Sequence, residues 1–127
     1  MAVVLQESGV AYAFADHVLA ELDRRGLRMN IFYVASVELF DRLPAARREQ
    51  IFPAALLREA IGITGFTLPT LYRWVGSEEG RARSLHPFRH GRYPGSGQAE
   101  MVMEEAGLDG PSQLKAVLEY AEAMGKR

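Results

Sequence analysis

Cysteine is absent from the 127 residues of the chain. Disulfides, zinc sites built on thiolates and thiol nucleophiles are therefore excluded, and a reducing compartment such as the cytoplasm fits this composition. The chain also has no excess of one charge, since it contains 15 Lys and Arg and 16 Asp and Glu, and its formal net charge is −1. A chain with this balance has no overall field that would attract nucleic acid or an anionic membrane.

Long hydrophobic runs are missing as well. The apolar stretches are too short to span a bilayer and are interrupted by charged residues. The first residues lack the basic start of a signal peptide, and Asp16 and His17 interrupt the apolar stretch that follows. We therefore expect a soluble cytoplasmic protein that binds neither nucleic acid nor membrane. The length suits one domain over residues 1–127.

Hydrophobic periodicity predicts strands that alternate with helices. We expect strands at residues 3–5, 29–35, 60–66 and 83–88, and helices at 10–25, 36–43, 44–52, 68–75, 97–106 and 111–124. The run MNIFYVA at 29–35 is continuously apolar after its first two residues, which is typical of a strand buried on both faces. Strands alternating with helices indicate an α/β fold with a mostly parallel sheet and helices on both faces.

The first predicted helix has the clearest pattern. Its apolar residues recur every four positions, at Val10, Phe14, Val18 and Leu22, and Gly26 is expected to end it in a left-handed conformation. The preceding segment QESGVAYA lies where a phosphate-binding loop would lie in an α/β fold. It has neither the three-glycine spacing of a dinucleotide fold nor a Walker lysine, so a plain turn capped by serine is favoured.

Basic side chains gather in one irregular segment and comprise Arg83, His86, Arg89, His90 and Arg92. They could bind an anion such as a phosphate or carboxylate. They could equally pair with acids of the same chain or a neighbouring subunit, for which residues 78–79 and 104–105 are available, and we favour this second interpretation. A metal site on the two histidines is not expected, because Pro87 lies between them and the arginines repel a cation.

Catalytic constellations are not found in the sequence. No serine lies in a nucleophile-elbow context, and the three histidines do not by themselves define a triad. Acid pairs such as Glu38 and Asp41 occupy positions that a helix would expose to solvent. The residues alone therefore predict an α/β domain without an autonomous active site.

The segment SVELFDRLPAARREQIFP at residues 36–53 resembles the C-terminal domain of transketolases. The matching residues are Ser36, Glu38, Leu39, Phe40, Asp41, Pro44, Arg48, Ile51 and Pro53. The order of the predicted elements agrees with that family over nearly the whole chain, as do the strings LYRWVG and GLDGPSQLKAVLEYA. The same module occurs in pyruvate-dehydrogenase-type and deoxyxylulose-phosphate-synthase-type relatives, so the resemblance does not define the reaction of a parent enzyme.

This resemblance implies a three-layer α/β/α domain with a mixed, mostly parallel sheet of about five strands, one of them antiparallel. It also implies a parent enzyme that uses thiamine diphosphate and Mg²⁺, bound by other domains through a Gly-Asp-Gly motif that this chain lacks. No catalytic, cofactor-binding or metal-binding residue is carried over. The expected role is structural assembly with the thiamine-diphosphate-binding domains of the same or a partner chain, in a homodimer.

One segment departs from the family pattern. Where the family has Asp-x-Phe-Gly-x-Ser, this chain has HPFRHGRYPGSGQAE, which is longer and more basic, so no family role is transferred to it. The alternative function is therefore a freestanding regulatory module that binds an anionic metabolite through residues 83–92.

Overall fold

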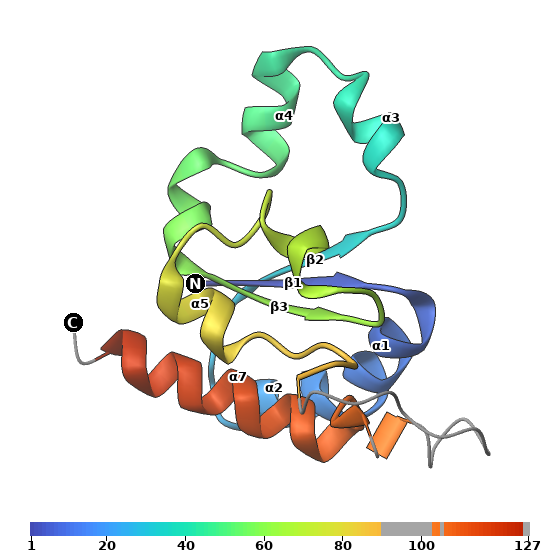
Figure 1. Cartoon of the computed structure of the whole chain (residues 1–127). Helices are drawn as coiled ribbons and strands as arrows, with labels where there is room; N and C mark the ends of the chain where they lie inside the picture. Colours follow the sequence, from blue (N-terminus) through green and yellow to red (C-terminus); the bar gives the residue numbers. More distant parts are fainter. Residues whose placement is uncertain (90–102, 105, 126–127) are drawn as a thin grey trace.

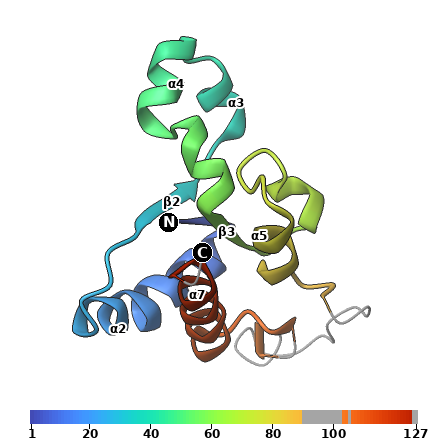
Figure 2. The same ribbon diagram turned by 90° about the vertical axis from the view of Figure 1, so that its left-hand side faces the viewer.

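The computed structural model describes residues 1–89, 103–104 and 106–125 (Figure 1). Its sheet has the strands β1 (Ala2–Gln6), β2 (Asn30–Val34) and β3 (Ala60–Thr64), in the order β2-β1-β3. Both pairings are parallel, with Ala2 opposite Asn30 on one side and Ala60 on the other. Helices lie on both faces of this sheet (Figures 1 and 2). The α/β class and the parallel sheet are thus confirmed.

The predicted number of strands is wrong. The described residues form a sheet of three strands, all parallel, rather than a mixed sheet of about five. The strand expected at 83–88 does not form. Arg83 is the last residue of α5 (Glu78–Arg83), and residues 87–88 lie in a turn. Ser77 caps α5, since its Oγ accepts a hydrogen bond from the Gly80 N–H at 2.9 Å. Only Leu85 adds to the sheet, through a single parallel bridge to Ile63.

A continuous helical segment follows β1. It comprises α1 (Ser8–Ala13), a π-helical turn (Phe14–Val18) and α2 (Leu19–Arg24). The predicted apolar stripe is confirmed, because all four of its residues are buried. Gly26 ends the segment with a φ of 68°, in the left-handed conformation expected of it.

The turn between β1 and α1 is built differently from the prediction. Glu7, not Ser8, caps the helix, and its carboxylate accepts hydrogen bonds from the N–H groups of Gly9 at 2.7 Å and Val10 at 3.3 Å. Glu7 has a φ of 83°, which is strained for a residue with a side chain. Gly65 leaves room for it, since a Cβ there would lie 2.8 Å from the Glu7 carboxylate.

The crossover from β2 to β3 forms an α-helical hairpin on one face of the sheet. It consists of α3 (Val37–Asp41) and α4 (Ala45–Ile51), followed by a 3₁₀ helix (Ala54–Glu59). Figure 1 shows the hairpin standing off the sheet at the end of β2. After β3, the helix expected at 68–75 is only a short 3₁₀ helix, Leu68–Leu71, followed by turns.

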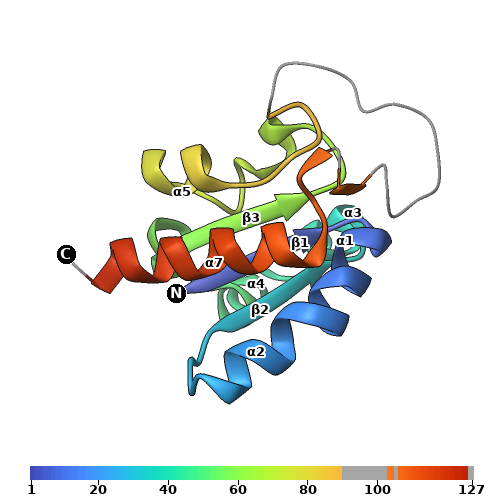
Figure 3. The same ribbon diagram turned by 90° about the horizontal axis from the view of Figure 1, so that it is seen from below.

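The opposite face is covered by the first helical segment and by α7 (Gly110–Gly125), which lie next to each other below the sheet (Figures 2 and 3). The prediction of a final helix is confirmed. Of the helix expected at 97–106, Met103, Glu104 and Ala106 are helical, and the rest lies outside the described residues. Within the described ranges, no helix is both long and apolar enough to cross a membrane.

Two apolar cores result, one on each face of the sheet, and β1 contributes alternate residues to both. Val3 and Leu5 belong to the core between the sheet and the helices α1 and α7. Ala2 and Val4 belong to the core between the sheet and the α3–α4 hairpin. The second core is completed by Phe52, Ala60, Leu71, Trp74 and Val75. It is this second core that supports the candidate site.

Candidate interaction surface

The apolar run of β2 lies at the edge of the sheet, so the prediction that it is buried on both faces is wrong. Phe32 and Val34 are only partly buried, and Tyr33 is 51% exposed. The cause is the strand order, which leaves one side of β2 without a neighbour in the described part of the chain. The same residue pattern fits a central strand and an edge strand whose partner is not part of this structure.

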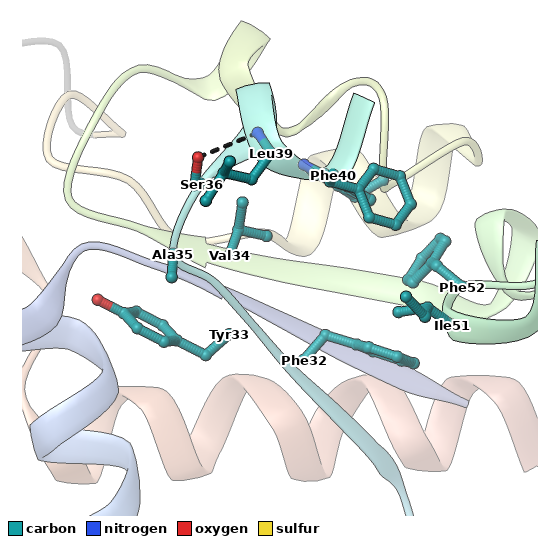
Figure 4. Close-up of a pocket in the computed structure, with 10 residues that line it drawn as sticks. Phe32, Tyr33, Val34, Ala35, Ser36, Leu39, Phe40, Ile51 and Phe52 are labelled. Atoms are coloured by element: carbon teal, nitrogen blue, oxygen red, sulfur yellow. Dashed lines mark hydrogen bonds between the residues drawn. The ribbon is translucent and has the colours of Figure 1, made fainter. Parts of the chain in front are cut away.

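An apolar groove of about 300 Å³ opens between β2 and the α3–α4 hairpin (Figure 4). All its lining residues except Ser36 are apolar or aromatic, and they are Phe32, Tyr33, Val34, Ala35, Leu39, Phe40, Ile51, Phe52 and Trp74. Leu39 is 63% exposed and Ile51 is 37% exposed. Exposed apolar side chains gathered around one groove are a feature of protein–protein contact sites.

Aromatic contacts hold the hairpin in place above the sheet. Phe52 packs edge-to-face against Phe32, with ring centroids 4.8 Å apart, and against Trp74 at 5.3 Å. Phe40 meets the same Trp74 ring at 5.1 Å, also edge-to-face. Trp74 is only 5% exposed, so a single buried indole supports both helices of the hairpin.

An ion pair adds a polar link between the hairpin and the segment after β3. The Arg73 guanidinium donates two hydrogen bonds to the Asp41 carboxylate, one of them 3.0 Å from Nη1 to Oδ2. These hydrogen bonds from Arg73 lower the pKa of Asp41. Asp41 was expected to be merely solvated, and its partner 32 residues away could not be read from the sequence.

The segment that resembles transketolases therefore folds into one structural unit. Ser36 caps α3 by accepting a hydrogen bond from the Leu39 N–H at 3.2 Å. Pro44 precedes α4 and Pro53 precedes the 3₁₀ helix, so each proline lies just before a helix. Glu38 is exposed in the first turn of α3, where a negative charge is favourable.

The predicted basic residues are only partly brought together. Arg83 pairs with Glu79 at 3.0 Å, in agreement with the interpretation of local pairing. Arg89 makes a long hydrogen bond of 3.4 Å to the Ala82 carbonyl oxygen, and His86 is partly buried. The remaining two, His90 and Arg92, lie outside the described residues.

A second, more polar pocket of about 390 Å³ lies beside Arg89. It is also lined by Ser112, Lys115 and Glu119 of α7, among others. Neither Arg89 nor Lys115 forms an ion pair with another described residue. Lys115 could not be recognised from the sequence as a site residue, because it is 26 positions from Arg89 and no local pattern joins them.

The two pockets differ in what they could hold. In the described ranges, no three His, Asp or Glu side chains lie close enough to hold a metal ion. The apolar groove has no set of carboxylates or cations that fits a diphosphate and its Mg²⁺, so the groove does not fit thiamine diphosphate. A scan against protein-family models and a search of curated proteins give no match to the chain. The groove is suited to apolar side chains of another polypeptide.

Proposed function

We propose that the chain is an assembly domain whose apolar groove packs against another protein domain, and that it catalyses no reaction by itself. The observation that carries this proposal is the exposure of Leu39 and Ile51 at the rim of a groove already lined by aromatic rings. Burying one such side chain fully contributes about 1.5–3 kcal/mol, which a docked partner would gain. Burying a polar surface of similar area would contribute much less binding free energy.

The family resemblance suggests which partner this is. The groove is formed largely by residues 32–52, which overlap most of the segment that matches transketolases. We propose a transketolase-like parent enzyme in the cytoplasm, whose other domains bind thiamine diphosphate and Mg²⁺. The partner of the groove is then such a thiamine-diphosphate-binding domain, in the same or a neighbouring chain.

Replacing Leu39 with Asp is expected to abolish this docking while leaving the fold intact. Leu39 is exposed and lies in the first turn of α3, where a carboxylate suits the helix. Buried in an interface, the same unpaired carboxylate is strongly unfavourable. The measurement is a pull-down from native lysate with wild-type and L39D bait, analysed by mass spectrometry and by assay for thiamine-diphosphate-dependent activity.

The matched control is Tyr12→Asp, which also places an acid on an exposed helical position, 76% exposed on α1. Wild type and Y12D should recover a polypeptide with a Gly-Asp-Gly motif, and L39D should not. Equal recovery by all three baits would contradict a role for the groove. Micromolar binding of thiamine diphosphate to the isolated chain, measured by calorimetry, would contradict the assembly proposal itself.

A second candidate function is the binding of an anionic metabolite in the pocket beside Arg89. The observation in its favour is that Arg89 and Lys115 line one pocket without an ion pair to another described residue. Phosphate compounds should then raise the melting temperature, since a ligand at 100 times its Kd adds about 2.7 kcal/mol to stability. In Arg89→Ala/Lys115→Ala the rise should disappear; an unchanged rise would rule the pocket out.

A further inference from the structure

The polar pocket beside Arg89 has an apolar floor and a charged rim. Its floor consists of Leu85, Ala106 and Ala116, all of which are buried. Two of these residues are alanines, whose short side chains leave space for the CH₂ groups of a small molecule. The pocket lies along α7, which covers the face of the sheet opposite to the apolar groove (Figures 1 and 2).

Three charged side chains of the rim, Arg89, Lys115 and Glu119, form no ion pair with another described residue. Lys115 and Glu119 are four positions apart on one face of α7. A lysine that precedes a glutamate is the less favourable order for a pair within a helix. Arg89 donates its long hydrogen bond to a carbonyl oxygen, so its charge meets no carboxylate there. The pocket therefore offers two positive charges and one negative charge to a ligand.

We propose that this pocket binds a small aliphatic molecule with one ammonium group and two negative charges. Such a ligand neutralises all three side chains, with its negative groups at Arg89 and Lys115 and its ammonium at Glu119. A dicarboxylic α-amino acid has these charges, and so does an amine that carries a phosphate monoester. The inference rests on the second candidate function and narrows its ligand from any anion to a molecule that is also a cation.

Glu119 is the group that selects against a simple anion. A dianion without an ammonium group brings like charges into the pocket, whereas an ammonium converts this repulsion into an attraction. Specificity of this kind needs a repulsive element as well as an attractive one, and Glu119 supplies both. The volume of about 390 Å³ lies within the range of small-molecule sites.

The test uses matched ligands that differ only in the amino group. Glutamate is paired with glutarate, and phosphoethanolamine with ethyl phosphate, and each is titrated into the whole chain and followed by NMR. Wild type should bind the amino member of a pair roughly 1.5- to 5-fold more tightly, as expected for one exposed ion pair. The pair that binds more tightly shows whether carboxylates or a phosphate supply the negative charge. Equal affinities within both pairs would overturn the proposal.

Glu119→Gln should remove this preference. Glutamine has a similar length and helix propensity, and position 119 is exposed, so the fold is retained. Glutarate should bind more tightly to E119Q than to wild type, because the repulsion is gone. The matched control is Glu38→Gln, which removes an exposed carboxylate from α3 on the other face of the sheet and should leave the preference unchanged. A preference that survives in E119Q would overturn the proposal.

The pocket and its selectivity fail in different measurements. If none of the four ligands binds to wild type, the second candidate function is wrong and this inference is wrong with it. If binding is lost in Arg89→Ala/Lys115→Ala but the two members of each pair bind equally well to wild type, the pocket is an anion site and only the ligand class is wrong. Binding that persists in the double variant would place the ligand elsewhere and overturn both.

Discussion

Replacing Gly80 with alanine is expected to lower the free energy of unfolding by about 3 kcal/mol. A Cβ at this position would lie 2.3 Å from the carbonyl oxygen of Ala60, 2.8 Å from Ser77 Oγ and 2.9 Å from Val75 Cγ1. Ala60 and Val75 are fully buried and the Ser77 hydroxyl accepts the Gly80 N–H. The clash is therefore with backbone and core atoms, and α5 has to move away from β3.

Gly125→Ala is the control for this substitution. Gly125 is the last residue of α7, and a Cβ there would meet no atom within 4 Å. Alanine is a better helix former than glycine by up to about 1 kcal/mol, so this variant should be neutral or slightly stabilised. Urea unfolding followed by circular dichroism separates the two cases. If the two variants have equal midpoints, α5 does not pack against β3 as described.

The helix that follows β1 shows how far local pattern can predict a fold. The buried stripe from Val10 to Leu22 could be predicted because its apolar residues recur with nearly the period of a helix. The left-handed conformation of Gly26 could be predicted because this glycine follows the last turn. The capping residue was missed for an equally physical reason. Serine at Ser8 is the commoner cap, but Glu7 has a longer side chain that reaches two N–H groups of the first turn.

The position of a strand within a sheet could not be predicted in the same way. β1 and β2 are similar apolar runs, yet β1 is wholly buried and β2 is the edge. Periodicity records which residue types alternate and contains no information on the neighbours of a strand. The prediction of a strand at 83–88 was wrong for a related reason. Ser77 caps a helix that includes Arg83, and the chain reaches the sheet only at Leu85.

The sequence analysis singled out only some residues of the candidate surface, and it did not predict their arrangement into a groove. The resemblance singled out Leu39, Phe40 and Asp41, two of which line the groove while the third binds Arg73. Nothing local indicates that Trp74 lies beneath Phe40 and Phe52, since the two phenylalanines come from different helices. The groove arises from contacts between segments distant in sequence, which only the folded chain brings together.

Replacing Trp74 with alanine is expected to cost about 3–5 kcal/mol of stability and to disrupt the groove. The indole touches Phe40 and Phe52, and it lies beneath the Arg73 guanidinium at 4.8 Å from ring centroid to Cζ. Its removal leaves a cavity under both helices of the hairpin. Because Trp74 is the only tryptophan, unfolding has to be followed by circular dichroism rather than by its fluorescence.

Trp74→Phe separates the role of the ring from that of its N–H. Trp74 Nε1 is buried without a hydrogen-bond partner among the described residues, so removing it breaks no hydrogen bond and relieves an unsatisfied donor. Phenylalanine keeps an aromatic surface against Phe40 and Phe52, and this variant should lose much less stability than W74A and still recover the partner in the pull-down. If both variants lose stability equally, the Nε1 group has a partner that stabilises the hairpin. If W74A also recovers the partner, the groove is not the docking site, because its supporting ring would then be dispensable for the interaction.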